Sequence, residues 1–165
     1  MSKTQSIAFG GRHLWAFDAS LAVWLAWFVL EWERRDRKHM ASLESFVAQA
    51  RLVATIGDYG LDLDALLGPL AIEPFTAIAR DVTQQIRVGG PISAASVAAI
   101  HLLDGMAPIR RGPELLDPEP IARVGDAIVG LLDGSLARPP SGTWWCVGTA
   151  DPAATIATVP HAPPG

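Results

Sequence analysis

Asp18 occupies the position in this sequence that most favours chemistry, because it is a carboxylate within an otherwise apolar stretch. Residues 14 to 30 are apolar apart from Asp18 and Ser20. A carboxylate buried in such surroundings needs a charged or hydrogen-bonded partner, or its protonation equilibrium shifts. Asp18 is therefore our candidate for a general acid, a general base or a ligand-binding group. The structural alternative is that it accepts hydrogen bonds from a loop amide, from His13 or from an arginine.

Two pairs of residues have a spacing that suits a metal ion. Asp36 and His39 are three residues apart, as are His101 and Asp104, and residues at this spacing share one face of a helix. Two imidazoles and two carboxylates would suit zinc or iron. Each acidic residue also has a simpler role, since Asp36 belongs to a charged run and Asp104 ends a predicted helix. We therefore expect no metal or other cofactor, and this set remains the alternative.

The sequence contains no recognisable nucleophile or phosphate-binding motif. The single cysteine, Cys146, lies between tryptophan and valine, and burial in such surroundings suppresses thiol reactivity. The glycine pairs at 10–11 and 89–90 lack the lysine and the spacing of a phosphate-binding loop, and no serine lies in a nucleophile elbow. These absences leave enzymatic activity undecided and favour a protein without a catalytic site. One cysteine also excludes an intramolecular disulfide and fits a reducing cytoplasm.

Tryptophan and arginine supply the remaining candidate binding residues. Tryptophan is enriched at binding hot spots, so Trp144-Trp145 is a candidate anchor for a partner, although strand alternation would turn the two rings to opposite faces. A pocket between helices, lined by tryptophans and Phe28 with Asp18 as its polar group, would instead bind a small hydrophobic molecule. The charged run 31–38 is a solvated helix face or, alternatively, a contact patch for an acidic partner. The candidate binding residues are Trp15, Asp18, Trp24, Trp27, Arg34, Arg35, Trp144 and Trp145.

The charge balance argues against one large class of partners. The chain of 165 residues carries a net charge of −4 at pH 7, whereas nucleic-acid-binding proteins show a basic face. We therefore expect no nucleic-acid partner. Half of the residues are hydrophobic and 18% are charged, which supplies enough apolar material for one domain with a core. The excess of arginine over lysine is typical of a GC-rich bacterial genome, and a homo-oligomer is compatible with this composition.

The apolar stretch from residue 14 to residue 30 also has to be considered as a membrane span. Its 17 residues are at the lower limit for crossing a bilayer, and the arginines after it resemble a positive-inside flank. Asp18 and four alanines make insertion less favourable, and the residues that follow do not form a signal-peptide cleavage site. We therefore predict a buried helix in a cytoplasmic protein, with membrane association through residues 14–32 as the alternative.

Hydrophobic periodicity predicts a mainly α fold. Apolar residues recur every three or four positions from about His13 to Ile56, which indicates one long bent helix or two helices. Capping and breaking residues predict further helices at 63–67, 74–87, 93–104 and 117–133. We expect a bundle of about five to six helices around a central hydrophobic helix, with a small C-terminal β-hairpin. The single domain then comprises residues 1–12 (an extension or short strand), 13–134 (the helical core), 143–159 (the hairpin) and 160–165 (a mobile tail).

These observations together favour a small non-catalytic bacterial binding protein that acts through a protein partner, of the immunity or accessory type. Aromatic content and mixed charge suit a protein interface. The alternative function is a small-molecule-binding protein or an acid–base enzyme that uses an aromatic helical pocket around Asp18. The position of Asp18 relative to a cavity distinguishes these two hypotheses.

Overall fold

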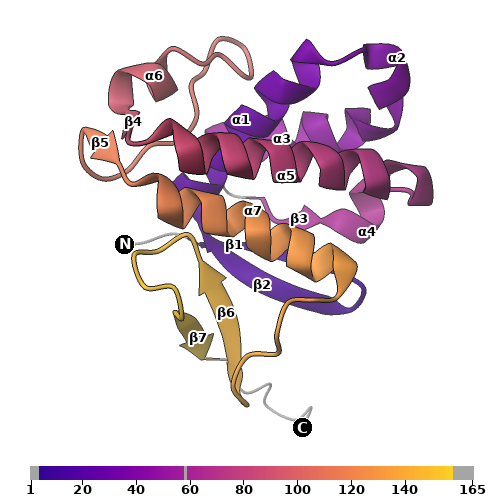
Figure 1. Cartoon of the computed structure of the whole chain (residues 1–165), viewed down its shortest axis with the longest axis vertical. Coiled ribbons are helices and arrows are strands. Elements are labelled where there is room, and N and C mark those ends of the chain that lie inside the picture. The colour runs from indigo at the N-terminus through magenta and orange to yellow at the C-terminus, as the bar shows by residue number, and fades with distance from the viewer. Residues whose placement is uncertain (1–3, 58, 158–165) are drawn as a thin grey trace, which may run out of the picture.

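The computed structural model shows an α/β fold, in which a mixed five-stranded sheet lies on one side and the long helices lie on the other (Figure 1). It describes residues 4–57 and 59–157, apart from the side chains of Arg37 and His39. The prediction of a mainly α, all-helical bundle with only a small hairpin is therefore wrong. The expected tail, residues 160–165, lies outside the described residues, as do residues 1–3 of the expected extension and the last two residues of the expected hairpin.

The sheet has the strand order β3-β1-β2-β6-β7. Its strands are β1 (Thr4–Phe9), β2 (Arg12–Phe17), β3 (Leu61–Asp62), β6 (Thr143–Val147) and β7 (Thr155–Ala157). The hairpins β1–β2 and β6–β7 are antiparallel, whereas β1 pairs with β3 and β2 with β6 in parallel. A second sheet consists of β4 (Ile92–Ser93) and β5 (Leu115–Leu116). The helices are α1 (Asp18–Arg34), α2 (Arg37–Met40), α3 (Glu44–Ile56), α4 (Leu63–Leu66), α5 (Ile72–Gly89), α6 (Ala94–Ala98) and α7 (Pro118–Asp133).

The first helix begins at Asp18 rather than near His13, because the preceding residues form strand β2. The turn between β1 and β2 consists of Gly10 and Gly11, whose φ angles are +58° and +71°. A two-residue turn with positive φ at both positions matches the twist of paired strands, and glycine adopts it without a steric cost. Leu14 and Ala16 on β2 are buried and their neighbours are less so. A period of two, not the helical period, therefore decides which of these residues face the core.

Helix α1 is the centre of the helical layer. It packs against α3, α5 and α7, and it buries side chains around almost its whole circumference. The indole Nε1 of Trp24 donates a hydrogen bond to Thr83 Oγ1 on α5 (3.1 Å). Helix α7 presents Gly125 at the same point, where an added Cβ would lie 1.9 Å from Thr83 Oγ1 and 2.3 Å from Trp24 Nε1. Trp24 is therefore a core residue at a close crossing of three helices.

The chain from residue 13 to residue 56 is neither one long helix nor two. Strand β2 precedes α1, and α2 with a short 3₁₀ helix connects α1 to α3. Asp36 caps α2 by accepting a hydrogen bond from the Lys38 backbone N–H (3.1 Å), and Trp32 Nε1 donates to the Met40 carbonyl across this connection (3.2 Å). Within residues 4–57 and 59–157, no helix is both long enough and apolar enough to cross a membrane.

The capping residues Ser93 and Asp117 correctly predict the starts of two helices, α6 and α7. Helix α7 begins at Pro118, and the Asp117 carboxylate accepts a hydrogen bond from the Glu119 backbone N–H (3.0 Å). Ser93 likewise caps α6. The predicted end of that helix at Asp104 is wrong, because α6 ends at Ala98 and an irregular connection follows it. This connection carries an arginine that is important for the candidate site.

Candidate functional site

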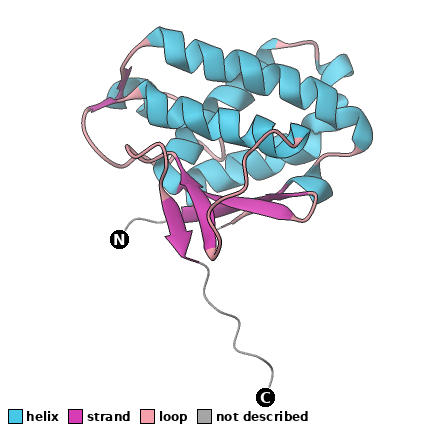
Figure 2. Cartoon of the chain, turned by 60° about the horizontal axis from the view of Figure 1, so that its bottom comes forward, coloured by secondary structure: helices cyan, strands magenta, loops and turns pink. Residues whose placement is uncertain are grey.

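The outer sheet face is the side of the five-stranded sheet that points away from the helices. Leu14 and Ala16 point into the core, so the intervening side chains of β2 point the other way. Strand register places Trp15 beside Cys146, and it places Trp144 beside a residue of β7. Figure 2 shows the long helices on the opposite side of the sheet. We define the outer sheet face by Ser6, His13, Trp15, Phe17, Trp144, Cys146 and Ile156.

The aromatic residues of the outer sheet face do not take part in the hydrophobic core. Trp15, Phe17 and Trp144 are half-buried, and none of the three belongs to the core cluster of the described chain. The His13 imidazole stacks on the Trp144 indole, with ring centroids 3.5 Å apart and planes inclined by 28°. This stack joins neighbouring strands and fixes the orientation of the indole. The face is therefore both apolar and pre-organised.

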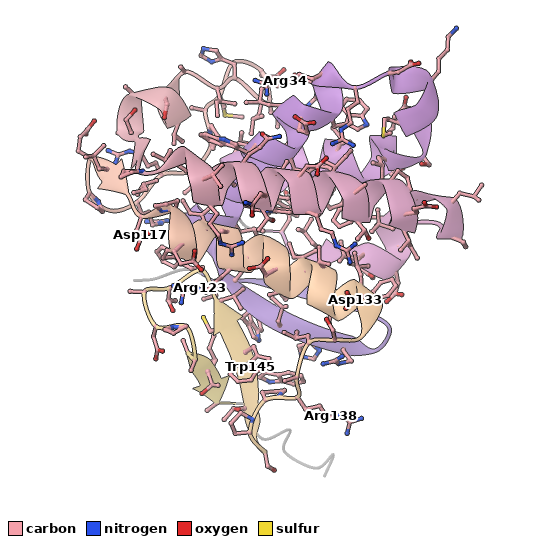
Figure 3. All side chains as sticks on the ribbon, in the orientation of Figure 1. Arg34, Asp117, Arg123, Asp133, Arg138 and Trp145 are labelled. Carbon is pink, nitrogen blue, oxygen red and sulfur yellow. The ribbon has the colours of Figure 1, made fainter. Side chains whose placement is uncertain are left out.

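A basic groove of about 410 Å³ adjoins the outer sheet face. It lies between the β1–β2 turn and the loop that leads from α7 to β6, and His13 and Trp144 belong both to the groove and to the face. Arg12 and Arg138 also line it, and no carboxylate is among its described lining residues. Figure 3 shows Arg138 extending from its loop, close to β6. The groove thus adds positive charge to one end of an aromatic surface.

Trp144 and Trp145 point to opposite faces of the sheet. Trp145 packs against the core cluster, and its Nε1 donates a hydrogen bond to the Ala137 carbonyl (2.8 Å). Trp144 stacks on His13 on the outer side. Strand alternation therefore separates the two candidate anchors, and only Trp144 belongs to the outer sheet face.

Asp18 forms a buried ion pair at the start of α1. Its side chain is 0% exposed, and its Oδ2 accepts a hydrogen bond from Arg111 Nε (3.2 Å). Arg111 comes from the irregular connection between α6 and α7, and its side chain is 43% exposed. Asp18 Oδ1 has no hydrogen-bond partner among the described residues. Of the partners considered from the sequence, the structure therefore supplies an arginine, which satisfies one oxygen of the two.

A cavity of about 380 Å³ opens beside this ion pair, and we call it the Arg111 pocket. It lies between the first residues of α1, the first residues of α7 and the turn that follows β6. We define it by Phe17, Ala19, Arg111, Leu116, Ile121 and Ala150. None of the tryptophans considered as neighbours of Asp18 is among its described lining residues. The cavity near Asp18 is therefore apolar, but it is not the aromatic helical pocket that the sequence suggested.

The remaining candidate residues lie elsewhere. Trp27 is half-buried on α1 and lines a surface hollow of about 380 Å³ beside the end of α5. Arg35 is paired with Glu31 and Asp81. Arg34 is 71% exposed, and Figure 3 places it at the opposite end of the molecule from Arg138. The structure thus brings Trp15 and Trp144 together and leaves Trp24, Trp27, Arg34 and Arg35 apart from them.

The alternative metal set receives no support from the described residues, which contain no group of three or more histidine, cysteine, aspartate or glutamate side chains able to hold a metal ion. His101 Nδ1 is hydrogen-bonded to the Gly105 carbonyl (2.8 Å), and Asp104 adopts a left-handed turn conformation with φ of +48°. Asp36 caps α2. The side chain of His39 lies outside the description.

Cys146 is shielded although it belongs to the outer sheet face. Its residue is 7% exposed, and burial raises the pKa of its thiol. A raised thiol pKa lowers the fraction of thiolate near neutral pH, which is the nucleophilic form. This environment suits a structural cysteine and disfavours a nucleophile.

Comparisons with protein-family models, with curated proteins and with solved structures find no match to this chain. The site must therefore be interpreted from its own geometry. Sequence reasoning missed Phe17, Arg12, Arg138 and Arg111. Residues 14–17 are all apolar, so no polar–apolar alternation marks Phe17 as outward-facing. Arg111 pairs with a residue 93 positions away, and no local pattern predicts that contact.

Proposed function

We propose that this protein is a non-catalytic binding protein whose outer sheet face docks on a segment of a partner protein. One observation carries the proposal: Trp15 and Trp144 lie outside the hydrophobic core, and the strand register turns them to the face opposite the core-facing Leu14 and Ala16. Trp15 and Trp144 are half-buried, so part of each ring remains accessible, and clustered accessible tryptophans are typical of interaction sites. The immunity or accessory role expected from the sequence is one form of this function.

The groove beside the face indicates the chemistry of the partner. Arg12, Arg138 and His13 line the groove, and its described lining residues include no carboxylate. The chain as a whole carries a net charge of −4, so this cationic groove contrasts with the rest of the molecule. Complementary charges steer association and fix the register of an interface. The partner segment should therefore present an apolar anchor to Trp144 and acidic residues to the arginines.

The size of the face favours a segment over a second copy of this chain. Four strands at about 4.8 Å spacing, about five residues long on average at ~3.3 Å per residue, give roughly 300 Å². A stable interface between two folded proteins buries about 800 Å² on each side. The outer sheet face alone is therefore too small for a stable dimer, but it is large enough for one extended segment or loop.

Parallel affinity capture tests the proposal. The unmodified chain and its Trp144→Ala variant are immobilised and exposed to extracts of cells that make the protein. A partner retained by the unmodified chain alone is then purified, and its Kd is measured by calorimetry. We expect Trp144→Ala to raise the Kd about 30-fold, as loss of a hot-spot residue worth ~2 kcal/mol would. Arg138→Glu should raise it about 5- to 10-fold, chiefly by slowing association at low salt.

Leu70→Ala is the matched control, because Leu70 is 87% exposed and lies next to α5 in the helical layer. It should leave the Kd unchanged. Equal retention of all proteins by the unmodified and Trp144→Ala chains contradicts the proposal, and so does a partner whose affinity depends on Leu70. A dimer in solution that Trp144→Ala dissociates would assign the face to a second copy instead. A purified chain that turns over a metabolite would overturn the non-catalytic function.

A further inference from the structure

The size and walls of the Arg111 pocket suit a small apolar molecule. The cavity of about 380 Å³ has a largely apolar wall that includes Phe17, Leu116 and Ile121. Ligand pockets start at about 300 Å³. At the ~30 Å³ that one water molecule occupies in the liquid, this pocket holds roughly 13 non-hydrogen atoms. It is too small for a folded partner and large enough for one compact ligand.

Arg111 is the one cationic side chain among the described lining residues of the pocket. Arg111 uses Nε to bind Asp18, and its terminal guanidinium nitrogens have no partner among the described residues. Arginine donates hydrogen bonds and accepts none. Asp117, a carboxylate in the lining, accepts the hydrogen bond that caps α7 through its Oδ1. A ligand held by Arg111 must therefore offer an acceptor oxygen.

The start of α1 adds to this preference. Phe17 is the N-cap residue and makes no side-chain capping hydrogen bond, and the first backbone N–H groups of any helix lack a carbonyl partner within it. Ala19 and Ser20, in the first turn, line the pocket. The positive end of this 17-residue helix favours negative charge, and Asp18 in the first turn supplies one carboxylate there. A carboxylate in the pocket would receive donors from Arg111 on one side and face the start of α1 on the other.

Asp18 explains why Arg111 stays at the pocket. Burying a carboxylate with one oxygen unpaired is unfavourable, yet α1 carries one at its first position. The contact it makes is the one that holds Arg111 Nε. Asp18 is therefore a positioning residue, because it orients the guanidinium without closing off its terminal nitrogens. It also balances the charge of Arg111, so a ligand is held by directed hydrogen bonds rather than by an excess of positive charge.

From these observations we infer that the Arg111 pocket binds a small apolar carboxylate of about ten to fifteen non-hydrogen atoms. The apolar body lies against Phe17, Leu116 and Ile121, and the carboxylate accepts hydrogen bonds from Arg111. This site shares Phe17 with the outer sheet face, but it needs neither Trp144 nor the basic groove. Substitutions of Trp144 and of Arg111 therefore test the two proposals separately.

Octanoate is a suitable probe, and binding to the full chain is followed by amide chemical shifts in NMR. We expect saturable shifts at Ala19, Gly112 and Gly148. Octan-1-ol and octylammonium should bind at least 10-fold more weakly, since neither carries a carboxylate. Ala150 lies in an exposed turn at the pocket, so Ala150→Phe should narrow the pocket without contacting the ion pair. This variant should lower the affinity for octanoate at least 10-fold.

Arg111→Lys keeps the charge but removes the planar fork of donors, and it should also weaken octanoate about 10-fold. Arg34→Lys is the same substitution at a distant, 71% exposed position, and it should have no effect. The amide NMR spectrum of each variant without octanoate, compared with that of the unmodified chain, verifies that the variant is folded. The inference is overturned if octanoate shows no saturation up to about 10 mM, if octylammonium binds as well as octanoate, or if Ala150→Phe leaves the octanoate affinity unchanged.

Discussion

Trp24 in the helical layer and Trp144 on the outer sheet face are the same residue type in opposite surroundings. Trp24 is 0% exposed, and its Nε1 is satisfied by Thr83. Trp144 is half-buried, lies outside the core cluster and stacks on His13. Folding has buried the whole apolar surface of Trp24, whereas Trp144 is half-buried and keeps part of its ring surface available to a partner. The difference separates residues that stabilise the fold from residues that can bind.

The largest predicted effect tests this difference directly by truncating each indole. Trp24→Ala should lower the free energy of unfolding by about 3–5 kcal/mol, because it leaves a cavity between three helices. Trp144→Ala should lower it by about 1–2 kcal/mol, because the half-buried indole loses one aromatic pair and part of its buried area. Urea unfolding followed by circular dichroism measures both. Equal losses for the two variants would show that the outer sheet face belongs to the core after all.

Gly125→Ala should have the next largest effect, because it tests the close crossing that surrounds Trp24. The added Cβ would overlap Thr83 Oγ1 and Trp24 Nε1, so the hydrogen bond between these atoms must break or the helices must separate. We expect a loss of about 1–3 kcal/mol. Gly89→Ala is the control, because nothing lies within 4 Å of its added Cβ, and alanine there should be neutral or stabilising by up to ~1 kcal/mol. A stabilised Gly125→Ala variant would contradict the packing at this crossing.

The misassigned strand β2 shows where the sequence was ambiguous. Leu14, Phe17 and Leu21 are spaced as on one face of a helix, and residues 14–17 are all apolar, so no polar–apolar alternation marks a strand there. Six residues are too few for periodicity to separate a helix from a strand. The signal that could have decided is Gly10-Gly11, because a glycine pair between two runs of strand length predicts a hairpin. The first strand was recognised only in part, and the second was assigned to the helix.

The candidate site was predictable only where it depends on local pattern. Strand alternation foresaw that Trp144 and Trp145 would point to opposite faces, but it did not say which one would face outward. That choice depends on Trp15 pairing in register with Cys146 across parallel strands far apart in sequence. Arg111 was missed for the same reason, since its contact with Asp18 is formed by the tertiary fold. Long-range pairing, not local propensity, assembles both the outer sheet face and the Arg111 pocket.

The smallest predicted effect concerns Cys146. The reactivity of its thiol measures how well the outer sheet face is shielded from reagents in solution. Burial raises the pKa of its thiol, so iodoacetamide at pH 8 should alkylate the folded chain more slowly than it alkylates free cysteine. Above the unfolded-state pKa of about 8.5, the unfolded chain releases a proton that the folded chain retains. The stabilisation that the protonated Cys146 thiol contributes is therefore complete below this pH. It is lost as the pH rises through the higher pKa of the folded state.

A Cys146→Ser variant isolates this contribution, because serine does not titrate in this range. Its free energy of unfolding should fall less steeply above pH 9 than that of the unmodified chain. Identical slopes would show that other groups cause the decline. Alkylation as fast as that of free cysteine would show that reagent reaches the sulfur between Trp15 and Trp144. In that case the outer sheet face opens readily, and the fixed stack on which its proposed role in binding depends would not hold.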